Sequence, residues 1–178
     1  METTVASSMD PINSIRSIKN WGAARTKSRQ EKALVRFLNS RAVATFLPTV
    51  SVRHVYGGGK IRTFHRPLFS GYVFYDTQAI PASSVYESKR VAQLLSPPDP
   101  EQLQSELANL ALAINAGGDL RETRLGQSGR PVRVKAGEMK GLCGELVRYG
   151  AASRLIIRVN FLSRCAELSI DEAFIEPI

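Results

Sequence analysis

The chain has 178 residues, of which 43% are hydrophobic, and a formal net charge of +8. This length accommodates one ordinary domain or two small ones. The sequence has no run of eighteen apolar residues and no basic opening followed by an apolar segment. We therefore expect a cytoplasmic protein that has neither a membrane span nor a secretory signal.

The first part of the chain predicts a strand and a helix. Residues 1–17 are polar and aperiodic, so we expect a disordered lead. Structure is expected to begin with a strand at 21–25. Ser28 and Glu31 have the spacing of a capping box, which predicts a helix from there to about Ser40.

The next segments complete a mixed domain over residues 18–116. Asp99 is a suitable N-cap, and Pro100 suits the first helical position of a helix with an apolar stripe. Gly117 is suited to end that helix. The other elements expected here are strands at 43–47, 68–75 and 91–95, a basic hairpin around glycines 57–59, and a short helix at 82–90.

The stretch 117–130 is predicted to be a flexible linker, because it combines four glycines with charged residues and few apolar ones. It separates the N-terminal domain from a C-terminal domain at 131–178. In that domain, apolar and polar residues alternate in 154–160 and again in 165–170, which is typical of half-buried strands. Glycines punctuate the turn before them. Several short strands in so few residues predict a small SH3-like β-barrel, and the fold class is α+β.

The positive charge is concentrated in the first half of the chain. Residues 16–66 contain twelve Lys or Arg residues and a single acid, Glu31, whereas residues 131–178 contain seven bases and six acids. Such an excess favours a polyanionic partner, and nucleic acid is the commonest one for a soluble protein. The alternative is that these charges serve solubility alone.

No arrangement of residues typical of catalysis or metal binding is visible. Cys143 and Cys165 lack the spacing of a zinc site, and His54 and His65 have no carboxylate or serine constellation in the surrounding sequence. The glycine turn between the two histidines is not followed by Gly-Lys-Ser/Thr, so it is not a phosphate-binding loop. We expect no metal, no cofactor and no enzymatic activity.

Several segments resemble the NusG family of transcription elongation and antitermination factors. LFSGYVF at 68–74 is similar to the family signature Leu-Phe-Pro-Gly-Tyr-Val-Phe, and NWGAARTKSRQEKAL and FLPTV resemble its opening segments. The barrel segment resembles a KOW motif, with matches at Val134, Lys135, Gly137, Gly141 and Gly144. The resemblance spans residues 19–177. It implies an NGN domain, with an antiparallel sheet and flanking helices, joined by a flexible linker to a KOW barrel.

The resemblance implies a non-catalytic factor that binds RNA polymerase, at the clamp helices of the β′ subunit and at the β subunit, and suppresses pausing or termination. By position, Phe69, Tyr72 and Phe74 would line the polymerase-binding depression, with core packing as the alternative. Ser83 and Ser84 would contact the β subunit, or simply begin a helix.

Two further sets of residues take roles from the resemblance. Arg25, Lys27 and Arg29 match the region that approaches the non-template strand and upstream DNA, although they also suit a solvated helix flank. Phe161 and Leu162 occupy the barrel turn that binds a small-subunit ribosomal protein or the termination factor Rho in the family. Inward packing of the pair is the alternative.

The sequence also departs from the family pattern. Ser70 replaces the usual proline of the signature, and Gly22, Ala23 and Ser163 are further departures. These changes favour a specialised, RfaH-like paralogue over a general factor, with a divergent sole copy left open. The rival interpretation is a ribosome-associated or free RNA-binding KOW protein. We expect a monomer, and the β pattern of the barrel segment argues against a helical, fold-switched form.

Overall fold

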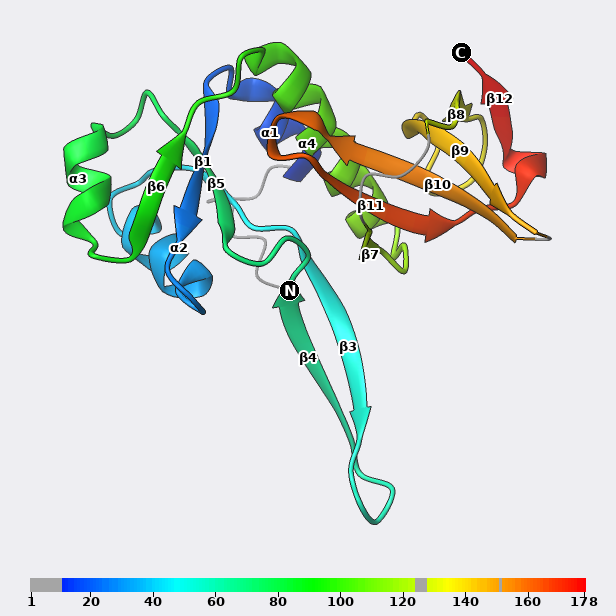
Figure 1. Cartoon of the computed structure of the whole chain (residues 1–178), viewed down its shortest axis with the longest axis horizontal. Coiled ribbons are helices and arrows are strands. Elements are labelled where there is room, and N and C mark those ends of the chain that lie inside the picture. Colours follow the sequence, from blue (N-terminus) through cyan, green and yellow to red (C-terminus); the bar gives the residue numbers. More distant parts are fainter. Residues whose placement is uncertain (1–10, 124–127, 151) are drawn as a thin grey trace.

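The structure is a computed structural model that describes residues 11–123, 128–150 and 152–178, so residues 1–10 of the predicted lead lie outside it. It confirms the mixed α+β class (Figure 1). The elements of the N-terminal part are α1 (Pro11–Ser17), β1 (Trp21–Thr26), α2 (Glu31–Asn39), β2 (Thr45–Phe46), β3 (Thr49–Val55), β4 (Ile61–Pro67), β5 (Tyr72–Asp76), α3 (Ala82–Glu87), β6 (Val91–Leu95) and α4 (Pro100–Asn115). Those that follow are β7 (Arg121–Thr123), β8 (Arg130–Val134), β9 (Cys143–Tyr149), β10 (Ala152–Val159), the 3₁₀ turn η1 (Asn160–Leu162), β11 (Arg164–Ser169), the 3₁₀ turn η2 (Glu172–Phe174) and β12 (Ile175–Pro177).

The N-terminal domain is built on an antiparallel sheet with strand order β2-β5-β1-β6. Helices α1 and α4 lie on one face, and α2 and α3 on the other (Figure 1). Side chains alternate along β1, so Ala23 packs with the first pair of helices and Ala24 with the second. Because both faces are covered, the central strands β1 and β5 are buried over most of their length.

The predicted capping box at Ser28 does not form. Helix α2 begins at Glu31, after an N-cap, Gln30, that makes no side-chain cap bond. The Glu31 carboxylate is buried and accepts a hydrogen bond of 2.7 Å from the backbone N–H of Gly71. Gly71 has a φ of +84°, which a glycine adopts without strain. The acid therefore holds the turn before β5 against α2, and this tertiary contact takes the place of the local cap.

The predicted disordered lead includes residues 11–17, which form the helix α1 in the structure. The Ile15 side chain is fully buried, and its carbonyl oxygen accepts a 3.0 Å hydrogen bond from Trp21 Nε1. From α4, the Gln104 side chain donates to the carbonyl oxygens of Arg16 and Ile18, at 2.8 and 2.7 Å. The segment is too short to show helical periodicity, and its contacts with α4 stabilise it.

Helix α4 begins and ends as the sequence predicts. The Asp99 side chain accepts a 2.9 Å hydrogen bond from the N–H of Gln102, and Pro100 occupies the first turn. Gly117, just beyond the helix, has a φ of +71°. Leu103, Leu107 and several further residues of the helix are buried, because α4 packs against both α1 and the C-terminal β-domain.

The C-terminal domain is a curled antiparallel sheet, called here the C-terminal barrel, in which β8 to β11 follow one another and β12 returns beside β8. Leu155, Ile157 and Val159 are buried, as their alternation predicts. Cys165, whose alternation with Ala166 and Leu168 predicts the outer face, is buried as well. Its neighbours in register are Arg158 and Thr123.

Part of the predicted linker packs against the barrel. Strand β7 extends the barrel sheet by pairing with β11, and Leu120 is buried. The backbone N–H of Gly129 donates to the Glu145 carboxylate at 2.8 Å. Residues 124–127 lie outside the described part of the chain. The domain boundaries themselves stay predictions. Within the described residues, no helix is long and apolar enough to cross a membrane.

The burial of Ile15 generates a first prediction. The Ile15→Ala substitution removes buried methyl groups between α1 and the rest of the N-terminal core, so it should lower the free energy of unfolding by about 2–5 kcal/mol. Denaturant unfolding measures this effect, and Ile178→Ala, at an exposed position, serves as the control. If residues up to 17 were a disordered lead, both variants would be equally stable.

Candidate functional site

Two of the three rings expected to face a polymerase are core residues. Phe69 and Phe74 are 1% and 0% exposed, and the Phe74 ring lies 6.3 Å from that of Phe46. Phe74 lies on the sheet face that α1 and α4 cover. The expectation that these two rings form an exposed interface is wrong, because neither has surface to offer to a partner. Core packing, the alternative, is correct for both.

Tyr72 is the one ring of the three that reaches the surface. It is half-buried on β5, directly opposite Arg25 of β1, whose partner on the other side is Gln93 of β6. These three side chains share one face of the sheet and form what we call the Tyr72 edge. From the barrel, the Arg164 guanidinium carbon lies 5.8 Å from the centroid of the Tyr72 ring. The Tyr72 edge therefore lies where the two domains meet.

A second contact joins the barrel to α4. The Glu106 carboxylate of α4 accepts hydrogen bonds from the backbone N–H of Asn160, at 3.2–3.3 Å, and from its Nδ2, at 2.7 Å. Nearby, Asn109 Oδ1 accepts from the backbone N–H of Cys143 at 3.3 Å. The turn η1, at one end of the β10–β11 pair, is thus held on α4 (Figure 1).

The residues expected to form an exposed pair in this turn are largely covered. Leu162 is buried, and Phe161 is half-buried against the same core. Phe161 lines a hollow of about 190 Å³ together with Asp99 and Leu103. The prediction of an exposed pair is wrong for Leu162 in this arrangement, because the side chain packs inward, as the alternative held.

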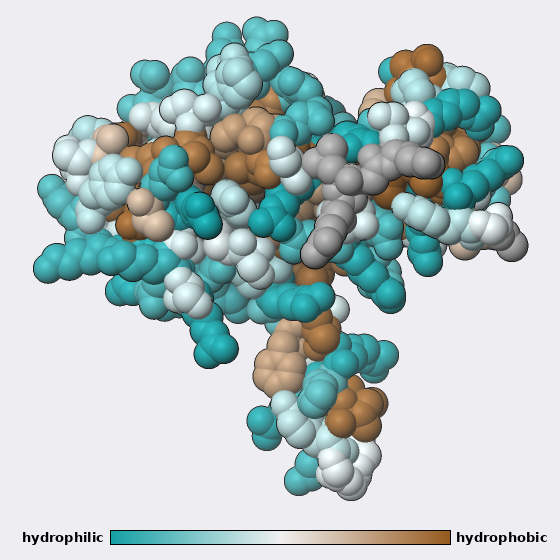
Figure 2. Space-filling model, in the orientation of Figure 1, coloured by the Kyte–Doolittle hydropathy of each residue, from teal (hydrophilic) through white to brown (hydrophobic). Residues whose placement is uncertain are grey.

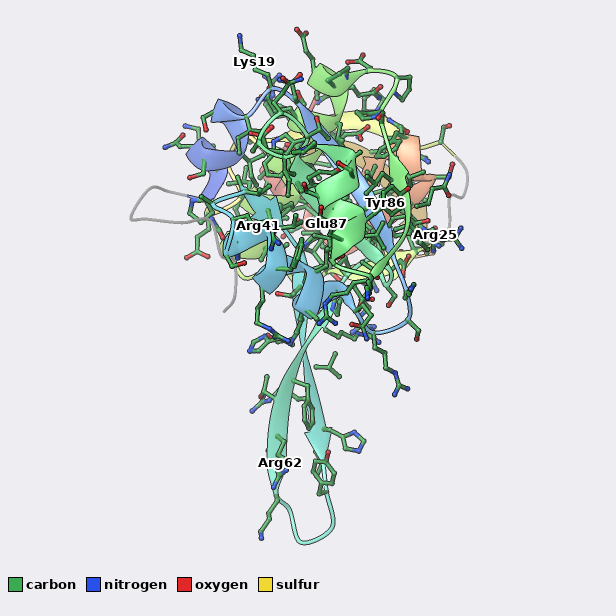
Figure 3. All side chains as sticks on the ribbon, turned by 90° about the vertical axis from the view of Figure 1, so that its left-hand side faces the viewer. Lys19, Arg25, Arg41, Arg62, Tyr86 and Glu87 are labelled. Carbon is green, nitrogen blue, oxygen red and sulfur yellow. The ribbon has the colours of Figure 1, made fainter. Side chains whose placement is uncertain are left out.

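The three bases predicted to contact nucleic acid are all exposed. Arg25 is on β1, at the side of the body in Figure 3, and Lys27 and Arg29 follow in the turn before α2. Arg29 has a φ of +57°, which is uncommon for a residue with a side chain. In the described part of the chain, none of the three forms a salt bridge, so their charges face solvent.

The two serines lie at the start of α3, after Pro81. Ser83 is exposed and Ser84 is half-buried, and the Ser84 N–H donates to the Pro81 carbonyl at 3.0 Å. Neither hydroxyl makes a hydrogen bond within residues 11–123, 128–150 and 152–178. Their position suits the simple helix start that was the alternative, and leaves Ser83 accessible to a partner.

The sequence did not show that the β3–β4 hairpin would stand away from the body (Figure 1). Arg53, Lys60, Arg62 and Arg66, four of the twelve bases of residues 16–66, belong to it. The Gly57–Gly59 turn and the basic residues around it were the available signal. That signal predicts a hairpin, but it does not say how far the hairpin projects.

Among the residues that the structure describes, Glu106 is the acid at the domain contact whose pKa is shifted. Burial raises the pKa of this carboxyl above its ordinary value, and the hydrogen bonds from Asn160 oppose the shift. No three His, Cys, Asp or Glu side chains of the described residues come together as metal ligands. The contact between α4 and η1 is therefore polar.

Comparison with known proteins relates the chain to one family. The family model described as NusG, transcription termination factor nusG, matches residues 19–110, just over half of the chain. No curated protein sequence matches significantly.

Two solved structures are also similar to the chain, at low sequence identity. The structure titled "Domain interaction in Thermotoga maritima NusG" is 15% identical, with 92% of this chain and 99% of that chain covered and a TM-score of 0.49. Conformation A of the MjSpt4:Spt5 complex is 17% identical, covers 89% of this chain and 97% of that one, and has a TM-score of 0.27.

The raised pKa of Glu106 generates a second prediction. The folded protein binds this proton more tightly than the unfolded chain does. The resulting stability is therefore present below the ordinary pKa of 4.5 and is lost as pH rises through the raised value. The unfolding free energy of the wild type should fall relative to that of Glu106→Gln as pH rises from about 4 to 7.

Urea unfolding at several pH values measures this difference. Glu101→Gln, at an exposed position in the first turn of the same helix, should follow the wild type. Parallel profiles for the wild type and Glu106→Gln would contradict the assignment.

Proposed function

Because the chain belongs to the NusG family, we propose that it is a transcription elongation or antitermination factor. In this proposal, the N-terminal domain binds RNA polymerase and suppresses pausing or termination in the cytoplasm, and the C-terminal barrel, as a KOW domain, recruits a partner. The observation that carries the proposal is the family match over residues 19–110, which runs from β1 through most of α4.

The Tyr72 edge is the part of the N-terminal domain that we assign to polymerase. Tyrosine and arginine are among the residue types that are enriched where binding energy concentrates in protein interfaces. Phe69 and Phe74 support this surface from beneath, as core residues, and do not contact the partner. Ser83 extends the proposed contact with the β subunit from the start of α3.

The barrel has to move for this binding to occur. Arg164 lies over Tyr72, and Asn160 is bonded to Glu106, so a partner that covers the Tyr72 edge competes with the barrel. Movement of η1 away from α4 would also uncover Phe161, which lines the hollow beside Asp99 and Leu103. Polymerase binding would then make Phe161 available in the same step to a small-subunit ribosomal protein or to Rho.

Arg25, Lys27 and Arg29 are assigned to phosphate contacts with upstream or non-template DNA. Such contacts need positive charge within reach and do not distinguish sequences. Arg25 belongs to the Tyr72 edge as well, which places the proposed DNA contact next to the proposed polymerase contact.

The assignment of Tyr72 generates a third prediction. The Tyr72→Ala substitution should weaken binding of the purified chain to core RNA polymerase about tenfold, which corresponds to about 1.4 kcal/mol. Binding is measured by fluorescence anisotropy of the labelled chain. Tyr149→Ala, which removes an exposed tyrosine of the barrel, is the matched control, and Arg164→Ala, which leaves the ring intact, should not weaken binding.

Equal affinities of the wild type and Tyr72→Ala would contradict the assigned surface. Co-sedimentation with ribosomes in the absence of any polymerase binding would favour the rival function, a ribosome-associated or free RNA-binding KOW protein.

The hydrogen bonds between Asn160 and Glu106 generate a fourth prediction. Asn160→Ala removes the side-chain donor to Glu106, and hydrogen bonds to charged groups contribute about 1.5–3 kcal/mol. The arrangement in which η1 is bonded to α4 and the barrel covers the Tyr72 edge is then less populated. Polymerase should therefore bind about tenfold more tightly. The same anisotropy assay measures this gain, with Asn115→Ala, at an exposed position near the end of α4, as the control. Unchanged affinity of Asn160→Ala would show that the barrel does not compete with polymerase.

A further inference from the structure

The β3–β4 hairpin is a projecting element with an unusual surface. It extends from the body as an isolated two-stranded ribbon, and Figure 2 shows apolar and polar side chains next to each other along it. The exposed fractions of Val55, Tyr56, Ile61 and Phe64 are 66, 43, 55 and 45%. A two-stranded ribbon in water is only marginally stable, and the cross-strand pairs that these apolar groups form still leave a large part of each side chain exposed to water. Such a display is typical of a binding surface.

The charge of the hairpin has one sign. Between Thr49 and Pro67 the sequence contains four Lys or Arg residues and no acid. None of the salt bridges in the described part of the chain involves these four bases, and Figure 3 shows Arg62 well away from the body. An unpaired cationic ribbon attracts a polyanion, which argues against an apolar or basic peptide as the occupant.

The strand register sorts these residues onto two different faces. Val52 is directly opposite Phe64 and His54 is opposite Arg62, while Tyr56 donates a 2.8 Å backbone hydrogen bond to Lys60. Residues two apart on a strand point to the same side. One side, called here the ring face, therefore carries three aromatic rings, those of His54, Tyr56 and Phe64. It also carries three Lys or Arg residues, which are Lys60, Arg62 and Arg66.

The ring face has internal contacts around the Tyr56 ring. The His54 and Tyr56 rings lie 4.8 Å apart in an edge-to-face arrangement, and the Arg62 guanidinium carbon lies 5.8 Å from the Tyr56 ring centroid. The opposite face carries one arginine, Arg53, and one ring, His65, together with Val55 and Ile61, which face each other across the strands. The two faces thus differ in chemistry while they share one ribbon.

We propose that the ring face is a binding site for single-stranded nucleic acid. Unpaired nucleobases stack on Tyr56 and Phe64. The phosphates of the same strand contact Lys60, Arg62 and Arg66. The rings are four residue positions apart along the ribbon, which is about 13 Å. A duplex is a poorer ligand, because its bases are already stacked and paired.

This site does not depend on the Tyr72 edge. It is on a different element, and it needs no polymerase, so the two proposals can fail separately. The full-length chain is titrated into a fluorescein-labelled twelve-nucleotide oligothymidylate, the matching oligouridylate, and a duplex of the same length. Fluorescence anisotropy reports the affinity. Tighter binding of either single strand than of the duplex supports the site. Comparison of the two single strands shows whether the site prefers DNA or RNA.

Substitutions of a ring test the stacking contact. Phe64→Leu keeps an apolar partner for Val52, so that the strand pairing is retained, but it removes the π face. It should weaken single-strand binding about 5- to 100-fold, whereas Phe64→Trp should restore it. Val55→Ala, which removes apolar area from the opposite face, is the matched control and should leave the affinity unchanged.

Substitutions of a basic side chain test which face of the hairpin contacts the phosphates. Arg62→Gln should lower the affinity and reduce the slope of log affinity against log salt by about 0.7, the value for one phosphate contact on a single strand. Arg53→Gln removes the same charge from the opposite face and should change both quantities less. Equal effects of the two arginine variants, equal binding of Phe64→Leu and the wild type, or duplex binding as tight as single-strand binding would each overturn the proposal.

Discussion

The packing of α4 between the N-terminal sheet and the C-terminal barrel is the constraint on which the other features depend. One side of the helix covers Phe74 and the neighbouring core, and another side receives η1 of the barrel. A single amphipathic helix can serve two partners only if more than one stripe of its surface is apolar. Helix α4 meets this condition, since Leu103, Leu107 and Leu110 form one buried stripe, and Ala108 and Ala113, to either side of that stripe, are buried as well.

This packing decides which residues are available to partners. It covers Phe69, Phe74 and Leu162 and leaves Tyr72 at the edge beneath Arg164. The family relationship concerns the N-terminal domain, and the functional surface proposed here is the part of that domain that the barrel partly shields. The β3–β4 hairpin is not involved in this competition, because it projects from the body (Figure 1).

Where the sequence predicted structure correctly, the determining interactions are local. The Asp99 cap, the period-2 pattern of β10 and the hairpin glycines act over a few residues. The capping box at Ser28 failed because Glu31 bonds to Gly71, forty residues away. Helix α1 was missed for a similar reason, since its order depends on Trp21 and on Gln104 of α4.

The sequence by itself determined the α+β class, the family signature at 68–74 and the basic character of the first half of the chain. Tertiary structure alone decided which residues of that signature are accessible, and it divided the hairpin into two chemically different faces on a ribbon that stands in solvent. The physical reason is that alternation assigns side chains to opposite faces of a strand, whereas exposure depends on what packs against each face. Those packing partners come from distant segments of the chain, such as α4 and the barrel.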